Sequence, residues 1–141
     1  MLKISTRGQY ALLVMTDLAE NTDDTFIPLK TLSHRRNLSV KYLEQILIQL
    51  GKAGLVTGSR GNNGGYKLSR PAEAYTAGDI LRAMEGNLSP RSSTENAHLA
   101  SAGNESFWTD FEETVNKYVD SVTLKELAQK NREFVGYEYC I

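Results

Sequence analysis

Apolar positions recur with helical spacing through the first third of the chain. Residues 5–20 are apolar on most sides, so we expect a largely buried helix that is capped by Ser5 or Thr6 and ends near Glu20. Pro28 suits the first turn of a second, short helix that ends near Arg36, with a tight turn at residues 37–38 after it.

A third helix is predicted from Ser39, a favourable N-cap, to Gly54, which stands where a left-handed residue ends a helix. Its apolar residues keep helical spacing over about four turns. We expect one apolar face made of Val40, Leu43, Ile46, Leu47, Leu50 and Ala53.

The pattern then changes to two short apolar segments, residues 55–57 and 66–68, separated by a glycine-rich loop at residues 60–65. This arrangement predicts a β-hairpin. Residues 76–79 cap a fourth helix that places Ile80, Leu81 and Met84 inward.

The last third begins with a Ser-, Asn-, Gly- and Ala-rich stretch at residues 87–106 that has no steady apolar period and is predicted to be a loop or linker. A long helix is expected from about Glu105 to Asp120. Thr123 to Glu126 is a capping box for a last helix, and residues 134–141 form an aromatic, apolar tail.

The order helix, short helix, tight turn, helix, hairpin is that of a winged helix-turn-helix. The predicted fold is mainly α with a small β-hairpin wing, followed by a long C-terminal dimerisation helix. We expect a DNA-binding domain at residues 1–86, a linker at 87–106, and a dimerisation helix, short helix and tail at 107–141.

Charge is unevenly distributed although the net charge is −1. Residues 1–70 contain ten Lys or Arg and five Asp or Glu, a net +5, whereas residues 71–141 contain six and twelve, a net −6. The basic half is suited to a polyanion such as DNA, and chance segregation of surface charge is the alternative.

No apolar stretch is long enough to span a membrane, no secretory signal is visible, and Cys140 is the single cysteine, so no internal disulfide can form. These observations predict a cytoplasmic protein. No nucleophile motif, metal-ligand spacing or acid pair indicates an enzyme, and the glycine-rich loop lacks the pattern of a nucleotide-binding loop.

The outward face of the third helix is the expected reader of the major groove. Ser and Gln can contact base edges, Glu can accept from the cytosine amino group, and Lys can contact phosphates. The candidates are Ser39, Lys41, Tyr42, Glu44, Gln45, Gln49 and Lys52.

The wing offers Arg60 to the narrow minor groove, with glycines that allow close approach of the backbone. Its predicted DNA-binding residues are Arg60, Gly61, Gly64, Gly65 and Tyr66. Lys3, Ser5 and Arg7 are further predicted DNA-binding residues, and Arg35 and Arg36 are expected to add basic charge around the same surface. A module that binds only proteins is the alternative, which the basic first half disfavours.

The long helix carries an aromatic and β-branched stripe that is either core or interface. A chain of this size has little core left to cover it, so we expect dimerisation through a symmetric contact. The stripe comprises Phe107, Trp108, Phe111, Val115, Tyr118, Val119 and Val122.

Several segments together resemble the Rrf-two family of bacterial transcriptional regulators. They are residues 1–10, 38–45, 54–56, 59–66, 76–80 and 84–86. The resemblance implies a homodimer on a pseudo-palindromic operator, with the long helix exchanged against its partner's. It also implies that Ser39, Glu44 and Gln45 lie near bases and that Arg60 lies near the minor groove.

Some members of that family bind an iron–sulfur cluster through cysteines and a histidine in the loop before the long helix. Here the corresponding loop holds no cysteine and only His98 as a possible ligand, so no cofactor or metal is expected. The resemblance to members that repress cysteine metabolism is stronger, although redox, nitric oxide or a small molecule is an alternative signal.

That branch implies a protein partner, cysteine synthase, which receives a C-terminal isoleucine in its active site. This chain ends in Tyr139, Cys140 and Ile141, and a free carboxylate beside an apolar side chain is a group that backbone nests capture. Packing of the tail against its own domain is the alternative. Nothing near Cys140 in the sequence lowers its pKa, which favours a plain thiol over a redox sensor.

Overall fold

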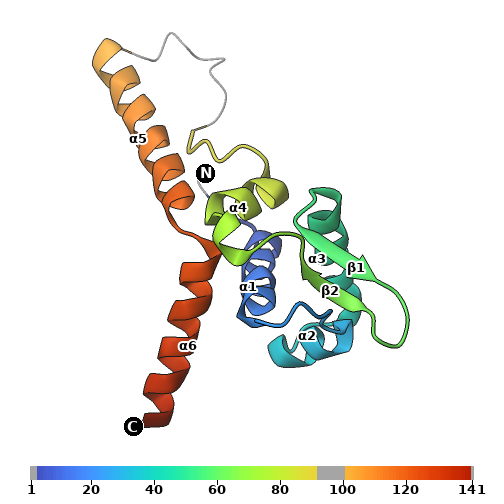
Figure 1. Cartoon of the computed structure of the whole chain (residues 1–141). Coiled ribbons are helices and arrows are strands. Elements are labelled where there is room, and N and C mark those ends of the chain that lie inside the picture. The colour runs from blue at the N-terminus through green and yellow to red at the C-terminus, as the bar shows by residue number, and fades with distance from the viewer. Residues whose placement is uncertain (1–2, 92–100, 141) are drawn as a thin grey trace.

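The computed structural model describes the backbone of residues 3–91 and 101–140, and side chains as far as residue 134 (Figure 1). A helical body carries a two-stranded wing, and two long helices follow. The elements in chain order are α1 (Thr6–Glu20), α2 (Leu29–Arg36), α3 (Val40–Lys52), β1 (Val56–Ser59), β2 (Gly65–Leu68), the 3-10 helix η1 (Ala72–Ala74), α4 (Ala77–Glu85), α5 (Ala102–Ser121) and α6 (Leu124–Cys140).

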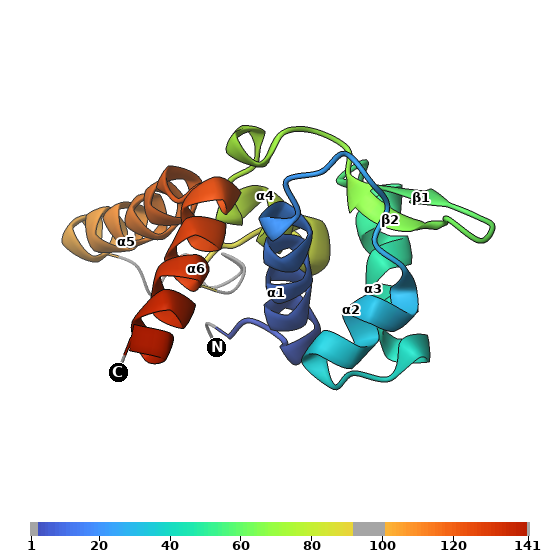
Figure 2. The same ribbon diagram turned by 60° about the horizontal axis from the view of Figure 1, so that its bottom comes forward.

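Helix α1 lies at the centre of the molecule, with α6 on one side and α2 and α3 on the other (Figure 2). Its residues 14–19 are all buried, as the apolar sequence predicts. One continuous core joins α1, α3, α4 and α6, and its fully buried members include Met15, Leu43, Ile46, Leu47, Leu50, Ile80 and Leu124.

The helix-turn-helix is formed by α2 and α3. Asn37 takes the left-handed conformation (φ 51°) that turns the chain between them, which confirms the tight turn. Arg36 at the end of α2 makes a two-pronged ion pair with Asp17 of α1, whose side chain is only 2% exposed. This pair ties α2 to the central helix.

The predicted hairpin is also present: β1 and β2 are antiparallel and pair Val56 with Leu68 and Ser59 with Gly65. The sequence did not indicate a third, single-residue strand. Ile27, in the connection between α1 and α2, exchanges two backbone hydrogen bonds of 2.9 Å with Tyr66. The wing is therefore fixed to the body at its base.

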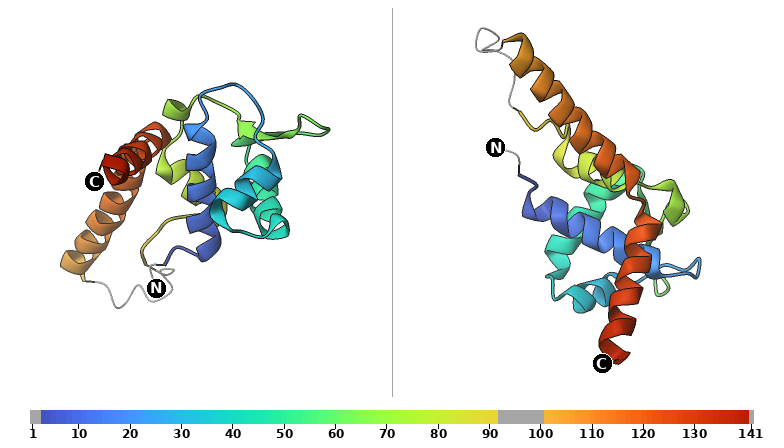
Figure 3. Two further views of the ribbon diagram at one scale, coloured as in Figure 1. Left: turned by 90° about the horizontal axis from the view of Figure 1, so that it is seen from below. Right: turned by 90° about the vertical axis from the view of Figure 1, so that its left-hand side faces the viewer.

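Helices α5 and α6 form a bent rod along one side of the body, and the N-terminal end of α5 projects beyond it (Figure 3). The bend is held by an antiparallel bridge between Thr76 and Thr123, next to a 2.8 Å hydrogen bond from the Ala77 amide to the Val122 carbonyl. After the bend, Leu124 and Ala128 are fully buried against the body.

Two expectations about element boundaries, and one about the apolar face of α3, were wrong. Helix α5 begins at Ala102, because the Ser101 hydroxyl accepts from the Asn104 amide as an N-cap. The final segment is helical to Cys140 and not a separate tail. Val40, expected inward, is 42% exposed at the first residue of α3, and Ala53 is exposed after its last turn.

Candidate nucleic-acid interface

The first turns of α3 present a polar, exposed surface. Ser39 is the N-cap, and its hydroxyl accepts from the Tyr42 amide at 3.1 Å. Lys41, Glu44 and Gln45 are exposed, while the apolar face beneath them is fully buried. The helix is therefore held by its apolar side and offers these polar groups to a ligand.

Arg7 of α1 joins this surface, although it is distant in sequence. Its guanidinium donates to the Gln45 side-chain carbonyl at 3.1 Å and lies 5.9 Å from the centre of the Tyr42 ring. Tyr42 in turn packs edge-on against Tyr10. Three predicted DNA-binding residues, Arg7, Tyr42 and Gln45, are thus brought into one cluster.

Ser5 and Gln49 are directed toward other parts of the protein. Ser5 caps α1, and both its amide and its hydroxyl donate to Glu85 at the end of α4. Gln49 is half-buried and donates to the Ala83 carbonyl at 3.3 Å. Both therefore connect α1 or α3 to α4, while Lys3 is exposed at the start of the described chain.

The tip of the wing is exposed throughout residues 57–63, including Arg60 and Gly61. Gly64 closes the turn by donating its amide to the Gly61 carbonyl at 3.0 Å. Arg60 therefore stands at the start of a tight, exposed turn, which is the position expected of a minor-groove arginine.

Gly65 and Tyr66 hold the base of the wing against the body, a structural role that the sequence did not show. Gly65 has a φ of +148°, and a Cβ there would overlap the carbonyl of Ile27. Tyr66 forms the backbone bridge to the same residue. The packing of the wing base thus explains this glycine without any ligand.

The basic residues at the end of α2 lie in two different environments. His34 and Arg35 are exposed, but Arg36 is committed to buried Asp17. The hydrogen bonds that Arg36 donates to the Asp17 carboxylate raise the pKa of Arg36 above its ordinary value. The expectation that Arg36 adds free positive charge to the surface is therefore wrong, because its charge is matched inside the body.

Sequence reasoning missed Asp17 and Glu85, which position the surface without being part of it. Asp17 could have been found, because a carboxylate inside an apolar helix signals a buried partner. Glu85 had no such signal, since its hydrogen bonds to Ser5 join residues 80 positions apart.

Helix α5 buries none of its residues within the single chain. Phe107 is 56% and Tyr118 68% exposed, and Phe107, Trp108 and Phe111 form one aromatic cluster with ring centres 5.0–6.3 Å apart. Val115, Val119 and Val122 of the same stripe are half-buried.

Polar contacts attach α5 to the rest of the chain. Arg82 of α4 donates to Asp120 at 2.6 Å and to Asn116 at 2.8 Å, and its hydrogen bond lowers the pKa of Asp120. Arg91 likewise pairs with Glu105 and lowers the pKa of that carboxyl. The direction of α5 is therefore set at both ends.

Some predictions fall outside the described residues. His98 and Ile141 belong to the segments whose structure is not described, as do the side chains of Tyr139 and Cys140. Within residues 3–91 and 101–134, no group of three or more His, Cys, Asp or Glu side chains is placed to hold a metal ion. Across the same part of the chain, every helix is too short or too polar to cross a membrane.

Comparison with known proteins identifies similar regulators. A family model named Rrf2, described as an iron-dependent transcriptional regulator, matches residues 4–130. The HTH-type transcriptional regulator CymR of Bacillus subtilis is 40% identical over 127 residues, which cover 90% of each chain. The structure of that protein, described as a global cysteine regulator, matches with a TM-score of 0.83 over 92% of this chain and 98% of the other.

Two further relatives agree. The crystal structure of Staphylococcus aureus CymR matches with a TM-score of 0.72 and 39% identity, covering 88% of this chain and 96% of that one. The HTH-type transcriptional regulator IscR of Yersinia pestis is 31% identical over 130 residues, 89% of this chain and 79% of its own. These matches extend through the winged helix into α5 and α6.

Proposed function

Because the chain belongs to the Rrf2 family of DNA-binding transcriptional regulators, we propose that it acts as a homodimer that represses genes of cysteine and sulfur metabolism from a pseudo-palindromic operator. DNA-binding regulation follows from the family. The homodimer, the repression and the gene set are our proposals, as is its place in the bacterial cytoplasm, where the DNA lies.

The observation that carries the proposal is the placing of two exposed polar elements on one side of the body. Helix α3 and the wing lie on the same side of α1, opposite α6 (Figure 2). Arg7 and Lys41 flank the start of α3, and Arg60 begins the wing turn. This arrangement suits α3 to the major groove and Arg60 to the neighbouring minor groove.

The contact between Arg7 and Gln45 bears on which bases are read. Because its carbonyl oxygen accepts from the Arg7 guanidinium, the Gln45 amide has its NH2 group left to donate. A donor beside a cation favours the acceptors of guanine over the amino group of adenine. Glu44, exposed beside it, is suited to the amino group of the paired cytosine.

The proposed dimer uses α5. Its aromatic cluster is an exposed apolar surface, and a symmetric contact would cover two copies of it at once. A dimer also supplies two copies of α3, as a two-fold symmetric operator requires.

The gene set rests on the similarity to CymR, whose B. subtilis structure is described as that of a global cysteine regulator. We further propose that cysteine synthase binds the C-terminal Tyr139, Cys140 and Ile141. We also propose that the protein works without an iron–sulfur cluster, because the sequence has one cysteine and such clusters are held by several thiolates.

Footprinting on the source organism's genomic DNA, with and without cysteine synthase, tests the function. We expect protection of two half-sites about one helical turn apart upstream of sulfur genes, strengthened by the enzyme and weakening steeply with salt. Protection only at unrelated genes would overturn the cysteine assignment, and no protection would overturn operator binding. A chain lacking its last four residues that keeps the enzyme's effect would overturn the docking of the C-terminus.

A further inference from the structure

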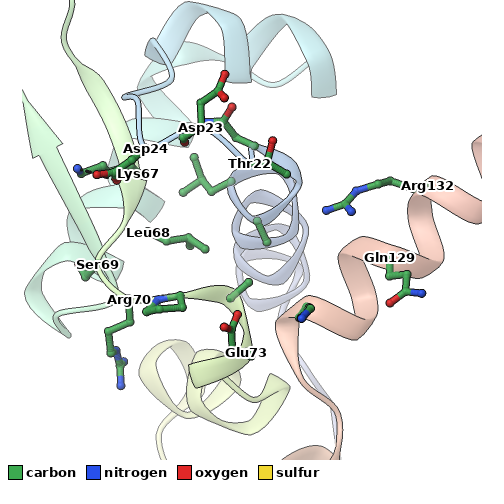
Figure 4. Close-up of a pocket in the computed structure, with 16 residues that line it drawn as sticks. Thr22, Asp23, Asp24, Lys67, Leu68, Ser69, Arg70, Glu73, Gln129 and Arg132 are labelled. Atoms are coloured by element: carbon green, nitrogen blue, oxygen red, sulfur yellow. Dashed lines mark hydrogen bonds and ion pairs between the residues drawn. The ribbon is translucent and has the colours of Figure 1, made fainter.

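A cavity of about 530 Å³ lies where the end of α1, the end of β2, η1 and α6 meet (Figure 4). Its size falls within the range of about 300–1,000 Å³ typical of small-molecule sites. Apolar side chains line part of it, among them Leu18, Leu68 and Pro71. The cavity is separate from the polar surface of α3, because none of its lining residues belongs to that helix.

Charged side chains of both signs surround this apolar part. Two cations are already engaged: Lys67 pairs with Asp24 at 3.0 Å, and Arg70 lies 4.5 Å from the centre of the Tyr75 ring. Within the described residues, no ion pair includes Asp23, Glu73, Lys125 or Arg132. All four residues are exposed, so these groups are available to a ligand at the rim of the cavity.

The available charges are separated by sign. Both carboxylates come from the body, Asp23 after α1 and Glu73 from η1, whereas both cations come from α6. Lys125 and Arg132 are seven residues apart, two turns along one face of α6. Figure 4 shows Arg132 extending from α6 toward Thr22 at the end of α1, and Glu73 on the η1 side.

We propose that this cavity binds a small zwitterion of the amino-acid type, with its carboxylate toward the cations of α6 and its ammonium group toward the carboxylates of the body. A ligand with both charges complements these four unpaired groups better than a simple anion or a simple cation does. Such a ligand would lie between α6 and β2, the second strand of the wing.

Isothermal titration calorimetry on the full-length protein tests the site without DNA. The probes are the twenty common L-amino acids and their glycyl dipeptides, each to about 10 mM. We expect at least one to bind, and its N-acetyl and carboxamide derivatives, which each lack one charge, to bind roughly tenfold more weakly or worse. No binding by any probe, or equal binding by a derivative, would overturn the proposal.

Variants then locate the site. Arg132→Gln and Glu73→Gln should each weaken binding by roughly tenfold. The matched controls Lys130→Gln and Glu126→Gln lie exposed on α6 outside the lining and should bind as the unaltered chain does. Binding that survives both cavity variants would place the ligand elsewhere and refute this site. Because this measurement contains no DNA, its failure would leave the proposed operator binding untouched.

Discussion

The winged-helix body and helix α5 differ in how completely a single chain buries their apolar side chains. In the body, Leu43, Ile46, Leu47 and Leu50 of α3 are all 0% exposed, whereas α5, the longest helix of the described chain, has no buried residue. The body is therefore stabilised by its own core, whereas the apolar face of α5 is left uncovered by the single chain, and in the proposed dimer a second copy would cover it.

The two regions also differ in how they are attached. The body is joined by apolar packing around α1 and by the buried Asp17 carboxylate, whereas α5 is held mainly by exposed pairs such as Arg82 with Asp120. Exposed pairs contribute little to stability. The same chain thus combines a body that is closed by its own core with a long helix whose apolar face stays exposed.

The largest expected effect separates the two regions directly. Replacing Phe111 and Val115 together by Asp should raise the dimer dissociation constant roughly a thousandfold, or about 4 kcal/mol, because two carboxylates would enter an apolar interface. Sedimentation should show monomers, and circular dichroism should show unchanged helical content. Lys117→Asp, on the opposite face of α5, is the control, and a double variant that remains dimeric would exclude α5 as the interface.

Within the body, Arg36→Met should lower the free energy of unfolding by about 3 kcal/mol, since it leaves the Asp17 carboxylate buried without its partner. Urea denaturation measures the change, which should be seen equally in the monomeric α5 variant. The neighbouring Arg35→Met, at an exposed position, should change stability by less than about 0.5 kcal/mol. Equal effects of the two substitutions would contradict the role given to the buried pair.

Two glycine substitutions should have opposite signs in the two regions. Gly65→Ala should destabilise the body by about 2 kcal/mol, because its backbone is left-handed and a Cβ would overlap the Ile27 carbonyl. Gly103→Ala, in the first turns of α5 with open space around it, should stabilise by up to about 1 kcal/mol. Thermal unfolding of each variant gives the comparison, and a stabilising Gly65→Ala would refute the tight packing of the wing base.

A substitution on the reading surface should affect DNA and not stability. Lys41→Ala should weaken operator binding by about 1 kcal/mol, equally across operator sequences, and reduce the salt dependence by about one phosphate contact. Fluorescence anisotropy at several salt concentrations measures both quantities. Lys130→Ala, exposed on α6, serves as the control. An unchanged salt dependence would remove Lys41 from the interface.

The smallest expected effect is the loss of α5 stability at acidic pH. Because Arg82 and Arg91 lower the pKa values of Asp120 and Glu105, their stabilisation of α5 is present above the ordinary carboxyl pKa values of 3.8 and 4.5 and is lost as the pH falls through the lowered values. The protection factors of the α5 amides, which correct the observed hydrogen exchange for its slower intrinsic rate in acid, should therefore fall at low pH in the monomeric variant. Asp120→Asn should remove part of this dependence, and an identical acid profile would argue against the Arg82 contact.

Much of the body could be predicted because its signals are local. Apolar periodicity located α1, α3 and α4, and the residues Ser39, Gly54 and Thr76 marked their ends through capping chemistry. The family resemblance, which rested on several segments of the body, is confirmed by the match over residues 4–130. The predicted DNA and partner contacts remain predictions.

The rest depended on distant contacts that local pattern does not encode. The pairing of Ile27 with Tyr66 and of Ser5 with Glu85 joins backbone or side chains far apart in sequence. The start of α5 was placed late because its first turns are Gly- and Asn-rich, so that only the cap at Ser101 marks it. The aromatic composition of residues 134–140 likewise gave no sign that α6 continues through them.

A small rotation at the joint between Thr76 and Thr123 would move the far end of α5 over a larger distance. Helix α5 has 20 residues and is therefore about 30 Å long, so a rotation of only about 10° at this joint would carry its far end through about 5 Å. In the proposed dimer that displacement would change the distance between the two reading heads, which must match the pitch of DNA. In that dimer the joint would set the spacing between the two copies of α3, and a small rotation there would become a larger displacement at the DNA.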